Sequence, residues 1–247
     1  MKGFTLITGA SAGIGEATAR LFASHGKNLI LIARRGERLE KIKKELSAVD
    51  VLLFEKDVTD ASAIEAMFRD DLKNISIDCI VNNAGLALGR DSFDQYDFKD
   101  IQTMIDVNIT AFLKVAHLGL PYLKKTKGHL VNLGSIAGMK SYGGGAVYCG
   151  TKFFVHAFTE ALRQDLLGTG VRVTTIAPGN VETEFSIVRL KGDRAKADAV
   201  YQGFEALKPD DIADAIWYAV SRPPHVNTEL MLVMPTDQAG ITVCRKQ

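Results

Sequence analysis

Tyr148 and Lys152 are the two residues of this chain whose types and spacing most clearly suggest chemistry. They lie four positions apart in a helical pattern, so the phenol and the ammonium share one helix face. A phenol exchanges protons poorly at neutral pH until a nearby cation lowers its pKa. Ser135, a short loop upstream, could bring a hydroxyl to the same ligand. These side chains are candidates for acid/base catalysis, although a Tyr–Lys pair at this spacing also occurs by chance on many helices.

A glycine-rich turn directly follows the first expected strand. Residues 8–15 read TGASAGIG and open the first expected helix. Glycine permits a tight turn and lets the backbone approach a pyrophosphate, and the N–H groups at a helix start favour an anion. The spacing differs from the commoner G-x-G-x-x-G pattern, so a plain strand–helix turn stays open as an alternative. We expect cofactor contacts from Gly9, Ser11, Ala12, Gly13, Ile14 and Gly15.

The end of the second expected strand indicates which dinucleotide would bind. An acidic residue there would accept a hydrogen bond from the adenosine ribose and select NAD. This chain has Arg34 and Arg35 instead, which predicts NADP, because guanidinium groups bind a 2′-phosphate through charge-assisted hydrogen bonds. Ser11 could add a hydroxyl, and Asp57 and Val58 after the third strand suit the adenine. The alternative is a solvated arginine pair at the start of a helix.

Short apolar runs alternate with helical patterns along the chain. Most runs are continuously apolar, as expected when both faces of a parallel sheet are covered. The alternation predicts an α/β protein with a three-layer, doubly wound Rossmann-type fold and a parallel sheet of about seven strands. The expected strands are 4–8, 28–33, 51–55, 77–82, 129–133, 171–177 and 230–234. The expected helices are 14–25, 36–46, 61–70, 98–123, 148–166 and 209–221.

Residues 183–207 interrupt this alternation. They are locally charged and fall between the end of the sixth expected strand and the last helix. An insertion at the carboxyl edge of a parallel sheet commonly covers the ligand crevice, so we expect a substrate lid rather than an ordinary surface excursion. No internal repeat or linker interrupts the pattern, which predicts one NADP-binding domain over residues 1–247.

Composition and charge exclude several classes of function. The 247 residues are 47% hydrophobic, and the net charge of +1 gives no electrostatic basis for binding nucleic acid or an acidic membrane. Cys79, Cys149 and Cys244 are few and scattered, so we expect neither a disulfide framework nor a metal site. No targeting signal or membrane span is visible, which predicts a cytoplasmic protein with a small-molecule substrate.

The motifs, taken in their order along the chain, resemble the short-chain dehydrogenases/reductases. The resemblance runs nearly end to end and rests on the turn 8–15, Asp57-Val58, Asn82-Asn83-Ala84-Gly85, Asn108, Ser135, Tyr148, Lys152, Pro178-Gly179 and Thr183. Residues 149–151 are Cys-Gly-Thr, where the superfamily commonly has small residues ending in Ser, but Thr151 keeps a hydroxyl. Asn180 stands where a hydrophobic residue is frequent, which we expect to alter the substrate fit.

Three stretches resemble one branch of this superfamily, the NADP-dependent 3-hydroxy acid dehydrogenases. They are 82–89 (NNAGLALG), 183–193 (TEFSIVRLKGD) and Met234-Pro235. The resemblance implies an oxidoreductase that interconverts a small 3-hydroxy acid, such as serine, allo-threonine or 3-hydroxypropionate, and its carbonyl form. A 3-ketoacyl thioester reductase would use the same catalytic residues, and a noncatalytic NADP-sensing protein would keep the fold. By analogy, we also expect a homotetramer that pairs through helices 98–123 and 148–166.

The resemblance also implies a role for each site residue. Tyr148 would act as general acid in carbonyl reduction and as general base in alcohol oxidation, while Lys152 would lower the phenol pKa and bind the nicotinamide ribose. Ser135 would stabilise charge on the substrate oxygen, and Asn108 would hold a water that links Lys152 to solvent. The remaining cofactor contacts are expected from Asn83, Ala84, Gly85, Pro178, Gly179, Val181 and Thr183.

A substrate carboxylate needs a cation or backbone donors in its pocket. Arg189 and Lys191, both within the expected lid, are the candidate cations, with Arg189 taken as a substrate residue. The alternative is that both side chains face solvent. The backbone N–H groups of residues 143–145, three glycines just before Tyr148, are further candidates.

Overall fold

Seven parallel strands form one sheet in the computed structural model, which describes residues 3–245. The order across the sheet is β3-β2-β1-β4-β5-β6-β7, so successive crossovers first move to one edge and then, after β3, to the other. β1 and β4 are paired neighbours at this reversal, and the connections that follow them leave in opposite directions, which opens a crevice at their carboxyl ends. The strands are β1 (Phe4–Thr8), β2 (Asn28–Ala33), β3 (Val51–Glu55), β4 (Ile77–Asn82), β5 (His129–Leu133), β6 (Arg172–Pro178) and β7 (Leu230–Val233).

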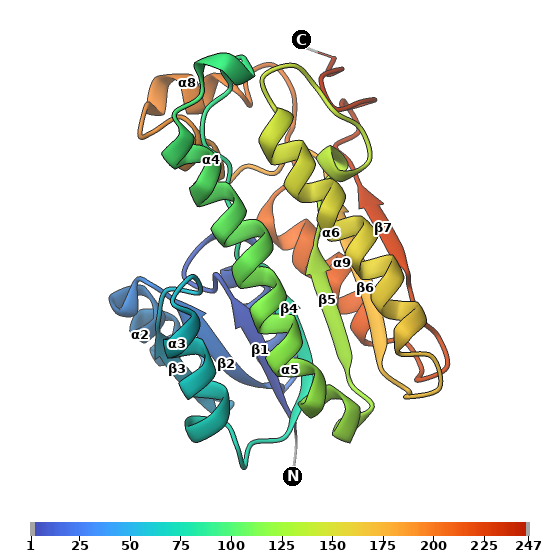
Figure 1. Cartoon of the computed structure of the whole chain (residues 1–247). Helices are drawn as coiled ribbons and strands as arrows, with labels where there is room; N and C mark the ends of the chain where they lie inside the picture. The colour runs from blue at the N-terminus through green and yellow to red at the C-terminus, as the bar shows by residue number, and fades with distance from the viewer. Residues whose placement is uncertain (1–2, 246–247) are drawn as a thin grey trace.

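Helices cover both faces of the sheet, as Figure 1 shows, and each face has its own apolar core. Neighbouring residues of one strand point to opposite faces, so Leu31 enters one core while Ile30 and Ile32 enter the other. The first core is closed by α1 (Gly13–Ser24), α2 (Gly36–Glu45) and α9 (Pro209–Val220). The second is closed by α3 (Ala61–Ala66), the π-helical turn η1 (Met67–Asp71), α5 (Phe112–Thr126) and α6 (Ala146–Asp165). The predicted three-layer, doubly wound fold is confirmed.

One predicted helix differs from the structure in a way that matters for the site. The sequence predicted a single helix over 98–123, whereas the chain forms α4 (Phe98–Ile105), the π-helical turn η3 (Asp106–Ala111) and then α5. A π turn adds one residue to a helix without changing its apolar character, so periodicity does not show it. The helix predicted over 61–70 is likewise divided, into α3 and the π turn η1. The other predicted element ends lie within two residues of those observed, except that α5 continues to Thr126.

The predicted lid, residues 183–207, contains two short helices, α7 (Phe185–Arg189) and α8 (Arg194–Ala199). Figure 1 places α8 beside α4, at one end of the sheet. The Lys191 ammonium lies 2.7 Å from the Asp100 carboxylate of α4, which ties the lid to that helix. Two further short turns, η2 (Phe93–Gln95) and η4 (Ile136–Gly138), flank the same region. Over residues 3–245, the helices lack the length and apolar character needed to cross a membrane.

Candidate active site

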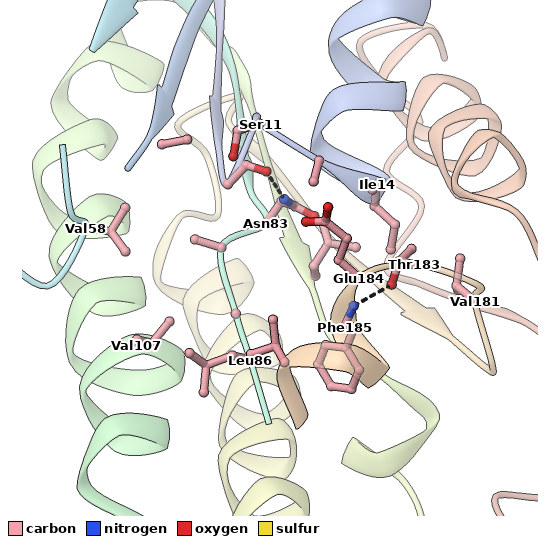
Figure 2. A pocket seen from close by; sticks show the side chains of 18 of the residues that line it. Ser11, Ile14, Val58, Asn83, Leu86, Val107, Val181, Thr183, Glu184 and Phe185 are labelled. Carbon is pink, nitrogen blue, oxygen red and sulfur yellow. Dashed lines mark hydrogen bonds between the residues drawn. The ribbon is translucent and has the colours of Figure 1, made fainter. Parts of the chain in front are cut away.

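A cavity of about 380 Å³ lies at the carboxyl ends of the central strands, where the strand order reverses. This is the position at which open α/β sheets bind their ligands. The cavity wall includes most of the residues that the sequence predicted for the cofactor and the reaction. They are Gly9, Ser11, Ala12, Gly13, Ile14, Arg34, Arg35, Asp57, Val58, Asn83, Ala84, Gly85, Ser135, Tyr148, Lys152, Pro178, Gly179, Val181 and Thr183. Figure 2 shows part of this wall, with Val58, Leu86 and Val107 on one side and Val181 on another.

The candidate catalytic residues meet on one side of this cavity. Tyr148 and Lys152 lie in α6 with only 8% and 7% of their surfaces exposed. Ser135 precedes the turn η4, and its hydroxyl accepts a hydrogen bond from the Ala137 N–H at 3.0 Å. The Lys152 ammonium donates to the Leu133 carbonyl at 2.7 Å. The fold thus brings together the three side chains that the sequence proposed as one device.

The direction of the Tyr148 pKa differs from the prediction. The sequence predicted that Lys152 would lower it, but burial raises the pKa of Tyr148 to about 12, against smaller lowering effects from the Ser135 hydroxyl and the Arg189 charge. The cause is that the phenol is enclosed by protein, which penalises its charged form. The Arg189 guanidinium is thus a cation that lowers this pKa, and the role of Lys152 in lowering it stays a prediction.

Lys152 is a buried amine whose charge is costly. Burial lowers its pKa from 10.5 to about 8. Only the Leu133 carbonyl is seen to accept a hydrogen bond from it within the described chain. An ammonium can donate three hydrogen bonds, so Lys152 keeps capacity for a ligand in the cavity that it lines.

Asn108 holds the loop after β4 rather than lining the cavity. Its amide nitrogen donates to the Leu86 carbonyl at 2.7 Å and to the Thr151 hydroxyl at 3.1 Å, and its amide oxygen accepts from the Leu86 N–H at 2.9 Å. The residue lies in the π turn η3, and only 2% of its surface is exposed. Its side chain thereby fixes the backbone beside Lys152. A water held by Asn108 stays a prediction.

The glycine-rich turn has the geometry that a dinucleotide requires. Gly9 and Gly13 have φ angles of +67° and +55°, which side chains rarely permit. A Cβ on Gly15 would lie 2.4 Å from the Gly9 carbonyl oxygen, so helix α1 could not approach the turn with any larger residue there. Gly15 packs behind the turn and, unlike Gly9 and Gly13, is not part of the cavity wall. This cradle fits a pyrophosphate laid across the backbone.

The arginines at the end of β2 lie at the rim of the cavity and carry ion pairs. The Arg35 guanidinium donates to the Ser11 hydroxyl at 3.1 Å and to the Glu184 carboxylate at 2.7 Å. Arg38 donates to the other Glu184 oxygen, also at 2.7 Å. Arg34 is 72% exposed and lies 3.8 Å from Asp57. The cluster provides cations and a hydroxyl where the sequence placed the 2′-phosphate.

Residues after β4 and β6 complete the central wall. The Thr8 hydroxyl accepts hydrogen bonds from the N–H groups of Asn83 and Ala84, at 3.0 and 2.9 Å. The Asn83 amide donates to the Thr8 carbonyl at 2.8 Å, which locks the β4 loop against the glycine-rich turn. On the opposite side, the Thr183 hydroxyl accepts from the Phe185 N–H at 3.2 Å, as Figure 2 shows.

Of the two candidate substrate cations, only Arg189 lies near Tyr148. Its guanidinium carbon is 5.5 Å from the Tyr148 ring centroid and 5.4 Å from that of Tyr142. The Arg189 Nε donates to the Gly89 carbonyl at 3.0 Å, whereas Nη2 is buried without a hydrogen-bond partner among the described residues. Lys191 points away, because its side chain is 60% exposed and pairs with Asp100. The expectation that Lys191 could serve the pocket is therefore wrong.

Several residues of the site were missed by the sequence reading. Phe185 packs at 5.6 Å from the Tyr148 ring, and Glu184 and Val188 of the lid line the cavity. The Ser135 N–H donates to the His156 ring nitrogen at 3.4 Å, and burial lowers the pKa of that ring to about 4, which keeps it a neutral acceptor. His156 lies four residues, about one helical turn, after Lys152 in α6. This spacing places it on the same helix face as Lys152 and could have predicted its place in the site. Burial raises the pKa of the Cys149 thiol, which disfavours its thiolate form.

Comparison with known proteins identifies the family. A family model described as "short chain dehydrogenase" matches residues 4–193, and the chain belongs to this family. Serine 3-dehydrogenase of Agrobacterium fabrum is 46% identical, with 100% of both chains covered. Sulfoacetaldehyde reductase 2 of Chromohalobacter salexigens is 46% identical over 97% of this chain and 96% of its own. The NADP-dependent 3-hydroxy acid dehydrogenase of Schizosaccharomyces pombe is 45% identical over 98% of this chain and 96% of its own.

A solved structure gives the same picture. The closed form of a serine dehydrogenase complexed with NADP⁺ superposes with a TM-score of 0.91 and 42% identity, over 98% of this chain and 100% of that chain. The predictions of the superfamily and of its fold are confirmed. The relatives' names also agree with the expected branch and with NADP as its cofactor.

Proposed function

We propose that this protein is an NADP(H)-dependent oxidoreductase that interconverts a small 3-hydroxy acid and its carbonyl form. The observation that carries the proposal is the meeting of Tyr148, Lys152 and Ser135 at a cavity whose other end holds Arg34 and Arg35. The full-length similarity to serine 3-dehydrogenase and to an NADP-dependent 3-hydroxy acid dehydrogenase supports both the cofactor and the substrate class.

The names of the relatives share one chemical feature. Three substrate types occur in these names: serine, 3-hydroxy acids in general, and sulfoacetaldehyde. In each of them, one carbon separates the acidic group from the carbon that changes oxidation state. Such a substrate needs a cation beside the catalytic phenol. Arg189 meets this need, because its guanidinium lies 5.5 Å from the Tyr148 ring and one of its nitrogens is buried and unpartnered among residues 3–245. A guanidinium binds carboxylate and sulfonate oxygens in a planar fork, so either acid would fit.

The residues would divide the reaction as follows. NADPH supplies the hydride for reduction, and NADP⁺ accepts it in oxidation. Tyr148 donates its proton to the carbonyl oxygen in reduction and removes the hydroxyl proton in oxidation. The Ser135 hydroxyl donates a hydrogen bond to that oxygen while charge develops on it. Lys152 would hold the nicotinamide ribose, and Gly9, Gly13 and the residues after β4 and β6 would fix the rest of the cofactor.

The lid forms one wall of the reaction chamber, through Glu184, Phe185 and Val188. Phe185 packs on Tyr148, and the Arg189 carbonyl accepts a hydrogen bond from the Gly89 N–H at 2.8 Å while its side chain donates back to the Gly89 carbonyl. These contacts seat α7 against the loop after β4, directly beside the catalytic phenol. A chamber walled by the lid, with a half-buried cation beside the phenol, favours a short acid over a long acyl thioester.

A spectrophotometric screen at the NADPH absorbance tests the proposal. The substrates are serine, allo-threonine, 3-hydroxypropionate and 3-hydroxyisobutyrate with NADP⁺, and sulfoacetaldehyde and a 3-ketoacyl thioester with NADPH, each repeated with the non-phosphorylated cofactor. We expect turnover of the short acids with the phosphorylated cofactor. Turnover of the thioester alone would instead identify a 3-ketoacyl thioester reductase, and NADPH binding without any turnover would indicate an NADP-sensing protein.

We also propose that the chain acts as one domain over residues 1–247 and assembles as a homotetramer. The support is an apolar groove on α5 and α6, lined by Leu113, His117, Leu120 and Phe158, at the helices through which the family is expected to pair. Light scattering at micromolar protein should give four times the chain mass. A cytoplasmic location stays a prediction from the sequence.

A further inference from the structure

Glu184 joins two parts of the molecule that are far apart in sequence. It precedes α7 in the lid, and its two carboxylate oxygens each accept a hydrogen bond at 2.7 Å, one from Arg35 and one from Arg38. These partners are 149 and 146 residues away, at the corner where β2 turns into α2. The lid is therefore connected to the corner between β2 and α2 by one carboxylate that two guanidinium groups share. We call this group of Glu184, Arg35 and Arg38 the clasp.

The clasp lies at the wall of the cavity that the cofactor is expected to fill, because Arg35 and Glu184 both line it. Thr183, just before it, lies against the glycine-rich turn, since a Cβ on Gly13 would be 3.2 Å from its methyl group. Phe185, just after it, packs on Tyr148. Residues 183–185 thus run from the expected pyrophosphate cradle to the catalytic phenol, and Figure 2 shows the three side chains along one wall of the pocket. A dinucleotide that reaches from Arg34 to Tyr148 must pass along this segment.

The charges allow the clasp and a 2′-phosphate to be present together. Arg34, Arg35 and Arg38 supply three positive charges, whereas Glu184 and Asp57 supply two negative charges, so the group keeps a net positive charge. Arg35 uses Nε for Ser11 and Nη1 for Glu184, and a guanidinium has five N–H donors, so donors are left for a phosphate. Arg38 is not part of the cavity wall, so its contact with Glu184 belongs to the clasp alone.

We propose that the clasp fastens the lid over bound cofactor and sets the rate at which NADP(H) leaves. This inference rests on the proposed function, because it needs NADP(H) in the cavity. Opening the lid requires breaking both guanidinium–carboxylate contacts, and the side chains involved are 41% to 47% exposed, so each contact contributes modestly and is screened by salt. The clasp therefore slows cofactor release without preventing it.

Stopped-flow displacement of bound NADPH, followed by its fluorescence, tests this role. Glu184→Gln should raise the release rate about threefold to tenfold, as expected from two half-exposed ion pairs. Arg38→Ala removes only one of the two contacts of Glu184 and should raise the rate less, and the double variant should be no faster than Glu184→Gln alone, because that variant already lacks both ion pairs. Glu182→Gln, which removes an equal charge from an exposed residue just before the lid, is the control and should release NADPH at the wild-type rate.

The outcomes separate this inference from the proposed function. Raising the salt concentration should speed release from the wild type more than from Glu184→Gln, in which the contacts of Arg34 and Arg35 with the phosphate are the remaining salt-dependent ones. If Glu184→Gln releases NADPH more slowly, Glu184 competes with the phosphate instead, and the clasp is refuted. Equal rates in Glu184→Gln and the wild type would also refute it. A wild type that binds no NADPH at all would instead overturn the proposed function.

Discussion

The Arg189 guanidinium lies over the Tyr148 ring, with the guanidinium carbon 5.5 Å from the ring centroid. The arginine acts on the phenol, since its charge lowers a Tyr148 pKa that burial raises to about 12. It also leaves Nη2 buried and without a partner among the described residues, which is costly unless a ligand satisfies it. One side chain can therefore both bind an anionic substrate and influence the catalytic acid.

Replacement of Arg189 by Ala should raise KM for acidic substrates more than for neutral ones. Loss of a charged hydrogen bond corresponds to about 1.5–3 kcal/mol, so KM for 3-hydroxypropionate should rise roughly tenfold to a hundredfold. The neutral isostere 3-hydroxypropionamide should show a much smaller change. Lys191→Ala is the control, because Lys191 pairs with Asp100 outside the chamber. Equal effects on the acid and the amide would remove Arg189 from the substrate site.

Replacement of both Arg34 and Arg35 by Ala should change the cofactor preference. Guanidinium contacts to the 2′-phosphate are charge-assisted and absent with NADH, so the ratio of NADPH to NADH affinity should fall by about tenfold or more. Equilibrium fluorescence titration of both cofactors measures this ratio. Arg38 is not part of the cavity wall, so Arg38→Ala is the control and should leave the ratio of the two affinities unchanged. An unaltered ratio in the double variant would refute the phosphate assignment.

Lys152 should reduce the stability of the fold at neutral pH. Its pKa is lowered by burial from 10.5 to about 8, so below pH 8 it is charged in both folded and unfolded states and the folded state carries the full cost. Between pH 8 and 10.5 the folded state binds fewer protons than the unfolded state, so stability rises with pH. The difference between the folded and unfolded pKa of Lys152 corresponds to a stability cost of about 3 kcal/mol. A variant that lacks the ammonium regains less than this amount, because it also loses the hydrogen bond to the Leu133 carbonyl.

The matching experiment compares Lys152→Met with the wild type by thermal melting. The inactive variant should have the higher Tm at pH 7, and this advantage should shrink as the pH approaches 10. Other lysines titrate equally in both proteins, so they cancel in the difference. A Tm difference that stays constant from pH 7 to 10 would show that Lys152 does not carry a buried charge.

Much of the site could be predicted because its residues follow strand ends. The glycine-rich turn, Asn83, Ser135 and Tyr148 with Lys152 belong to short local patterns, and a parallel sheet brings the carboxyl ends of its strands together. The alternating apolar runs also predicted the seven strands to within one residue at each end. Local patterns and sheet topology were sufficient for this part of the structure.

The features of the site that the sequence did not predict depend on contacts between distant segments or on burial. Glu184 meets Arg35 across 149 residues, and no local pattern marks that pairing. Lys191 and Arg189 are two positions apart in the same charged segment, yet only packing decides that one turns to Tyr148 and the other to Asp100. The raised Tyr148 pKa follows from enclosure of the phenol, which residue types alone do not reveal.

The central claim is that the Tyr148 hydroxyl transfers the proton of the reaction. Tyr148→Phe removes this single oxygen and keeps the ring that packs on Phe185. We expect kcat with the best acid of the screen to fall by about 10²–10⁴-fold, while the NADPH dissociation constant stays within about twofold of the wild type. A variant that binds NADPH normally and turns over at a rate near that of the wild type would contradict the account.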